Sequence, residues 1–162
     1  MKEGDKQLRI YIAGPLFSDA ERSYNECLNN FFKEIGFETF LPQHNGYKLS
    51  DLLVKDLSKR DAINLIFEKD IEEIQKSDIL VLIVDGRVPD EGACVEAGYA
   101  YSLGKECIGL KTDCRTLMSD LDNPLIVGVL KNRIARSFKE LEKFLLEIKA
   151  NYKIPNELKT FN

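Results

Sequence analysis

Histidine and tryptophan are scarce in this chain: its 162 residues include one histidine, His44, and no tryptophan. The four cysteines form no Cys-x-x-Cys pair; they are Cys27, Cys94, Cys107 and Cys114. Zinc sites are built mainly from Cys and His at short spacings, so no metal site is expected. We interpret the cysteines as reduced thiols, which predicts a cytoplasmic protein.

An excess of basic residues and long apolar runs are also missing. Lys and Arg number 23 against 27 Asp and Glu, giving a net charge of −4, so no nucleic acid polymer is expected as a partner. The first 14 residues lack the apolar core of a signal peptide, and no run approaches membrane-spanning length, so no membrane association is expected. Residues 13–15 (AGP) do not form a G-x-G-x-x-G turn, and there is no P-loop, which argues against the usual NAD and ATP cradles.

What the chain does contain is an alternation of apolar strands and amphipathic helices. Strands are predicted at 8–13, 37–41, 79–84, 106–111 and 133–135, and helices at 18–35, 55–76, 91–103, 125–130 and 137–150. The polar stretch 43–53 is predicted to be a loop. This order indicates βαβ crossovers and a parallel sheet covered on both faces. We therefore predict a single α/β domain over residues 1–162, with its core at about 8–150. Its expected fold is doubly wound and flavodoxin-like (Rossmann-like), with about five strands.

Ligands in such folds bind beyond the carboxyl ends of the strands. That rule places four loops, 13–17, 42–47, 85–91 and 111–123, around one expected pocket.

Four residues near these loops could carry chemistry. Glu96 is predicted in a helix among small residues that include Gly92, which would leave room for a ligand; the alternative is a solvated carboxylate on a closely packed helix. Asp90 lies at the predicted start of that helix, where Asp is also a favoured N-cap. Asp70 could equally be an exposed helical charge, and Tyr11, in the first strand, needs a partner for its hydroxyl if it is buried.

Three segments resemble the nucleoside 2-deoxyribosyltransferase family. They are residues 10–17 (IYIAGPLF), Asp70-Ile71 followed by residues 77–79 (SDI), and residues 89–100 (PDEGACVEAGYA). The resemblance runs from about Leu8 to Val129. It implies transfer of 2-deoxyribose between purine or pyrimidine bases, through a covalent deoxyribosyl-glutamate and with net retention. It also implies small-molecule deoxynucleosides and free bases as partners, and no metal or organic cofactor.

The resemblance further implies a role for each matching residue. Glu96 matches the nucleophile, Tyr11 the residue that orients it, and Asp70 the aspartate that assists proton transfer to the base. Asp90 matches the residue that binds the 5′-hydroxyl, and Asn123 one that completes a neighbouring subunit's site, which implies a homo-oligomer. The remaining substrate-binding candidates, in the matching segments and the loop after the second strand, are Gly14, Phe17, Gln43 and Gly92.

Some features depart from the family or leave alternatives open. Residues 42–47 align only loosely with the base-contacting segment, with Asn45 as a second candidate after Gln43, and the tail 151–162 has no assigned role. A sister group hydrolyses nucleoside 5′-monophosphates but tends to have serine where this chain has Asp90. A non-catalytic nucleoside-binding module is a further alternative. A phospho-receiver domain, suggested by residues 78–85, would need an acidic pair after the first strand, which is absent.

Overall fold

The computed structural model describes residues 6–116 and 122–152, and its centre is a five-stranded sheet. The strands are β1 (Arg9–Ala13), β2 (Glu38–Phe40), β3 (Ile79–Ile83), β4 (Glu106–Leu110) and β5 (Ile134–Ala135). They lie in the order β2-β1-β3-β4-β5, and every neighbouring pair is parallel. The predicted doubly wound α/β fold is confirmed, and this order is the flavodoxin-like one.

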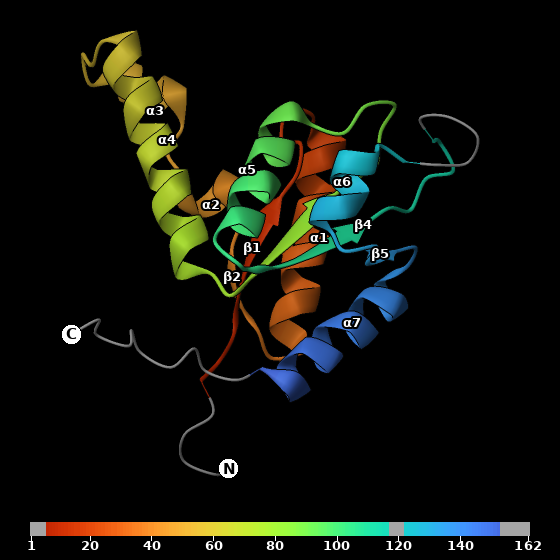
Figure 1. The fold of residues 1–162 in the computed structure, drawn as a ribbon. Helices are drawn as coiled ribbons and strands as arrows, with labels where there is room; N and C mark the ends of the chain where they lie inside the picture. The colour runs from red at the N-terminus through yellow and green to blue at the C-terminus, as the bar shows by residue number, and fades with distance from the viewer. Residues whose placement is uncertain (1–5, 117–121, 153–162) are drawn as a thin grey trace, which may run out of the picture.

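Helices cover both faces of the sheet (Figure 1). They are α1 (Asp19–Glu34), α2 (Pro42–Asn45), α3 (Leu49–Val54), α4 (Lys59–Lys76), α5 (Glu91–Ser102), α6 (Pro124–Val129) and α7 (Phe138–Asn151). None of the helices within the described ranges is long and apolar enough to cross a membrane.

Alternation along the strands sends side chains to two separate cores. One face packs Ile10, Ile12 and the matching residues of β3 and β4 against α1 and α7. The other face packs Tyr11, Ala13, Leu80 and Leu82 against the alanines of α5 and Ile74 of α4. Tyr11 therefore belongs to the same face as α4 and α5.

The start of α1 follows its sequence signals. Ser18 accepts a hydrogen bond from the Glu21 backbone N–H, and the Glu21 side chain accepts one from the Ser18 N–H, so the capping box forms. At the other end, Gly36 has a φ of +85°, a conformation that glycine adopts without steric cost. Both ends of the helix were predictable from local chemistry.

The prediction of a loop at 43–53 is wrong, because two short helices, α2 and α3, lie there. Pro42 begins α2, and Leu52 is the buried residue of α3. Helices this short give too few turns for an apolar period to show. The prediction that a helix begins at residue 55 is also wrong: Asp56 has a φ of +59°, and α4 begins only after its N-cap, Ser58.

Candidate active site

The central interaction joins Tyr11 of β1 to Glu96 of α5. The Tyr11 hydroxyl donates a hydrogen bond to Glu96 Oε1 at 2.7 Å, and the tyrosine is fully buried. Burial raises the pKa of Tyr11 far above its usual value, and the charges of Glu96 and Asp70 raise it further. Tyr11 thus remains a hydrogen-bond donor at any physiological pH.

Glu96 binds its proton unusually tightly. Its pKa is raised to about 8 in total. Burial is the main cause and the charges of Asp70 and Asp90 add to it, while the hydrogen bond from Tyr11 acts in the opposite direction. The hydrogen bond from Tyr11 favours the ionised form of Glu96, but desolvation outweighs it, since an ionised carboxylate loses more hydration on burial than one donor restores.

Asp70, on α4, is the second perturbed carboxyl group. Its pKa is raised to about 6 in total; burial is the main cause, and an interaction with the Tyr11 hydroxyl partly offsets it. The Tyr11 hydroxyl therefore influences both carboxyl groups, which come from different helices. Perturbed carboxyl groups brought together in this way are typical of catalytic sites.

A cavity of about 1010 Å³ opens beside Asp70. It lies between α1, α2, the start of α3 and α4, and Phe17, Gln43, Ile66 and Asp70 are among its lining residues. Phe17 is 76% exposed, so its ring is free to cover a ligand. Cavities of this size accommodate molecules as large as a nucleoside.

Gln43 is held in place at the wall of this cavity. Its side-chain amide donates to the Arg22 carbonyl at 3.0 Å and to Glu26 Oε1 at 2.8 Å, while its oxygen accepts from Asn25 at 3.0 Å. Asn25 is buried and also donates to the Pro15 carbonyl. Sequence reasoning missed Asn25, although a polar residue on the buried stripe of α1 was a usable signal.

Asp90 and the two glycines have roles in the local structure. Asp90 caps α5 by accepting a hydrogen bond from the Ala93 N–H at 2.8 Å. A Cβ at Gly14 would lie 2.8 Å from Cδ1 of Ile83, so the turn after β1 packs too closely for a larger residue. A Cβ at Gly92 would lie 3.2 Å from Asp90 Oδ1, and Gly92 itself is exposed. The predicted roles of Gly14 and Gly92 in substrate binding stay predictions.

The sequence profile of the family described as "Nucleoside 2-deoxyribosyltransferase" matches residues 10–152. The chain belongs to the nucleoside 2-deoxyribosyltransferase family. The match continues past the limit expected from the motifs, Val129, to Tyr152.

Three individual proteins illustrate the similarity. The structure of a conserved protein from Enterococcus faecalis has a TM-score of 0.71 and 26% identity, covering 88% of this chain and 99% of that one. A 2-deoxyribosyltransferase from Bacillus psychrosaccharolyticus has a TM-score of 0.67 and 21% identity, covering 83% and 90%. An uncharacterized protein of Ureaplasma parvum is 30% identical over 105 residues, which are 62% of this chain and 63% of that protein's length.

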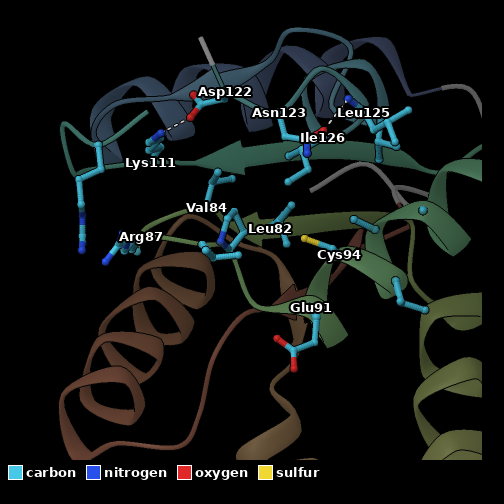
Figure 2. A pocket seen from close by; sticks show the side chains of 18 of the residues that line it. Leu82, Val84, Arg87, Glu91, Cys94, Lys111, Asp122, Asn123, Leu125 and Ile126 are labelled. Atoms are coloured by element: carbon cyan, nitrogen blue, oxygen red, sulfur yellow. Dashed lines mark hydrogen bonds and ion pairs between the residues drawn. The ribbon is translucent and has the colours of Figure 1, made fainter. Parts of the chain in front are cut away.

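The four loops expected around one pocket belong to two cavities in this family member. The loop 85–91 and the described parts of the loop 111–123, residues 111–116 and 122–123, contribute instead to a cavity of about 620 Å³ between α5 and α6. Figure 2 shows Cys94, Leu125 and Ile126 at this cavity. Helix α5 packs between α4, which borders the first cavity, and α6, which borders the second (Figure 1).

Asn123 lies at this second cavity and lines it (Figure 2). Its side chain accepts a hydrogen bond from the Leu125 N–H at 3.0 Å and caps α6. Beside it, Lys111 and Asp122 form a buried ion pair. Neither Tyr11 nor Glu96 is among the residues that line this cavity, so Asn123 is not brought to the Tyr11–Glu96 pair within one chain.

Metal ligands are not grouped in the part of the chain that the structure describes. Within residues 6–116 and 122–152, no set of three or more His, Cys, Asp or Glu side chains is arranged to hold a metal ion.

Proposed function

We propose that this protein transfers 2-deoxyribose between nucleobases, with Glu96 as the nucleophile that attacks C1′ of a 2′-deoxynucleoside. The observation that carries the proposal is the hydrogen bond from Tyr11 to Glu96, with Asp70 next to the same hydroxyl and a large cavity beside it. Membership in the deoxyribosyltransferase family supports the reaction class.

The first step requires Glu96 to be ionised and Asp70 to be protonated. A single hydroxyl between them can maintain that state, because Tyr11 can accept a hydrogen bond from protonated Asp70 while it donates to the Glu96 carboxylate. With pKa values of about 8 and 6, the free protein holds the proton on Glu96 at neutral pH. A coupled shift of two protons through Tyr11 then produces the reactive form.

Cleavage follows the logic of a retaining glycosidase. As the C1′–N bond breaks, the developing oxocarbenium ion is trapped by Glu96 as an ester, and the proton from Asp70 passes to the departing base. A second base, entering from the side that the first vacated, attacks C1′ while its N–H proton passes to the Asp70 carboxylate, and the Glu96 carboxylate leaves. Two inversions give net retention, and neither a metal nor an organic cofactor is required.

The groups that would hold the substrate are divided between two regions, the cavity beside Asp70 and the start of α5. The base would occupy the cavity beside Asp70, with Phe17 over it and Gln43 in its wall. The sugar would lie over α5, with its 5′-hydroxyl at Asp90 and the backbone of Gly14 and Gly92 beside it. A carboxylate at Asp90 disfavours a 5′-phosphate: each pair of like unit charges at about 4 Å costs roughly 4 kcal/mol at an effective dielectric near 20.

We further propose that the active unit is a homo-oligomer in which Asn123 serves a neighbouring subunit. The rim of the cavity at Asn123 carries large apolar side chains that face solvent: Val88 is 76%, Val95 69% and Leu125 81% exposed. Exposed apolar patches of this kind mark association surfaces. A two-fold contact there would give each subunit the other's Asn123.

The reaction can be tested by incubating the protein with deoxyinosine, with and without adenine or cytosine, and separating the products by chromatography. Formation of deoxyadenosine or deoxycytidine would establish the transfer reaction. Hypoxanthine released at the same rate without an added base would indicate a hydrolase, and deoxynucleoside monophosphates would then be compared. Absence of any turnover, with binding retained, would refute the enzymatic proposal in favour of a nucleoside-binding module.

A further inference from the structure

A buried ion cluster lies one helical turn from Asp70. Glu73 of α4 is only 3% exposed, and it pairs with Arg9 Nη2 of β1 at 2.6 Å and with Lys69 Nζ at 2.8 Å. Lys76 Nζ lies 3.4 Å from the same carboxylate. A carboxylate with so little access to water is stabilised by these surrounding cations, which compensate its charge. The cluster therefore ties α4 to the strand that carries Tyr11.

The same cluster is connected to the reactive groups in two ways. Along the backbone, Arg9 precedes Tyr11 by two residues and Lys69 precedes Asp70 by one. Through the packing, Arg9 Cζ and Lys69 Nζ lie 5.7 and 6.0 Å from the ring centroid of Phe40. Phe40 in turn stacks on Tyr11, with centroids 5.3 Å apart and an interplanar angle of 19°.

We propose that Arg9, Lys69 and Glu73 form a positioning cluster for the active site, fixing α4 against β1 and supplying the charges beside which Asp70 exchanges its proton. None of the three touches the proposed substrate; they act through Asp70 and, by way of Phe40, through Tyr11. The importance of the cluster for catalysis rests on the function proposed above.

The charges of the cluster act on Asp70 in opposite directions. After burial, which is the main cause of the raised pKa of Asp70, the charge of Glu73 raises it further and that of Lys69 lowers it. The other groups facing Asp70 are Tyr11 from β1 and Glu96 from α5, with Asp90 close to Glu96. The titratable or charged residues on the remaining walls of the cavity are Asp19, Arg22, Glu26, His44, Tyr47 and Lys48.

Two single substitutions in this one cluster should therefore shift the titration of Asp70 in opposite directions. Glu73→Gln removes a negative charge and leaves Arg9 and Lys69 uncompensated, so the pKa of Asp70 should fall. Lys69→Gln removes a cation and exposes Asp70 to Glu73, so the pKa should rise. We expect each shift to be about half to one pH unit, as for a change of one charge at short range.

The measurement is ¹³C NMR of the aspartate carboxyl carbons over a pH series, with Asp70→Asn to identify the signal, alongside the pH–rate profile for transfer. Matched controls are Glu34→Gln of α1 and Lys59→Gln of α4, which make the same charge changes on exposed residues away from the cluster. A merely structural cluster would lower stability in both test variants but would not give shifts of opposite sign.

The outcomes separate the two proposals. If the two variants shift the pKa of Asp70 in opposite directions by NMR, and the apparent pKa of the pH–rate profile moves in the same way, both proposals are supported. Opposite shifts in a protein without transfer activity would support the cluster and refute the function. If transfer occurs but the pKa of Asp70 is unchanged in the variants, or if the control variants shift it equally, the proposed role of the cluster is refuted and the proposed function is not. If Glu73→Gln does not fold, Lys69→Gln decides, and an unchanged pKa there overturns the proposal.

Discussion

Replacing Glu96 by glutamine should stabilise the folded protein at alkaline pH while abolishing transfer. The raised pKa of Glu96 means that the folded state binds this proton more tightly than the unfolded chain does. As the pH rises from the pKa of the unfolded chain, 4.5, to that of the folded protein, about 8, ionisation of Glu96 favours unfolding, so the wild-type protein loses stability. Glutamine keeps an oxygen that can accept the hydrogen bond from Tyr11 and cannot ionise.

The size of the effect follows from the two pKa values. A shift from 4.5 to about 8 corresponds, at about 1.36 kcal/mol per unit, to a ceiling of roughly 5 kcal/mol. Glu96 keeps some contact with solvent, and part of the raised pKa comes from repulsion by Asp70. We therefore expect Glu96→Gln to increase the free energy of unfolding by about 2 to 4 kcal/mol. The gain should be absent below about pH 4.5 and complete above about pH 8, equivalent to roughly 5 to 10 °C in Tm.

The assay is urea unfolding followed by circular dichroism at intervals between about pH 5 and pH 9. Glu91→Gln is the matched control, because Glu91 is an exposed carboxylate in the first turn of the same helix; its effect should change little with pH. Parallel pH-dependences for wild-type protein and Glu96→Gln would refute the conclusion that burial of Glu96 is costly.

Three further predictions concern the reaction. Tyr11→Phe removes the donor to Glu96, so the pKa of Glu96 should rise, as followed by carboxyl ¹³C NMR, and kcat should fall roughly ten- to hundredfold; an unchanged titration would contradict the assigned role of the hydroxyl. Asp90→Ser should raise the ratio of kcat/KM for deoxynucleotides to that for deoxynucleosides, and an unchanged ratio would remove the electrostatic argument. Glu96→Ala and Asn123→Ala should each be inactive, yet after unfolding and refolding as an equimolar mixture they should recover roughly a quarter of wild-type activity if paired subunits exchange Asn123; no recovery would place Asn123 outside the neighbour's site.

Local patterns were sufficient to predict most of the framework. The apolar runs, the Ser18–Glu21 capping box and the strand–helix alternation predicted a parallel sheet and most element boundaries within a few residues. They did so because side-chain periodicity and capping depend on neighbours in the sequence. The same reasoning failed at 43–53, where single turns of helix form because Leu52 is buried by the rest of the structure.

The sequence by itself determined which residues could be reactive, since Glu96, Asp70 and Tyr11 stand in motifs that can be read without coordinates. Only the tertiary structure decided their state. Tyr11 and Glu96 are 85 positions apart, and the burial that raises the pKa of Glu96 comes from β1, α4 and α5 packed together. The separation of the two cavities by α5 was equally inaccessible, because desolvation and shape arise from segments that are distant in the chain and meet only in the folded protein.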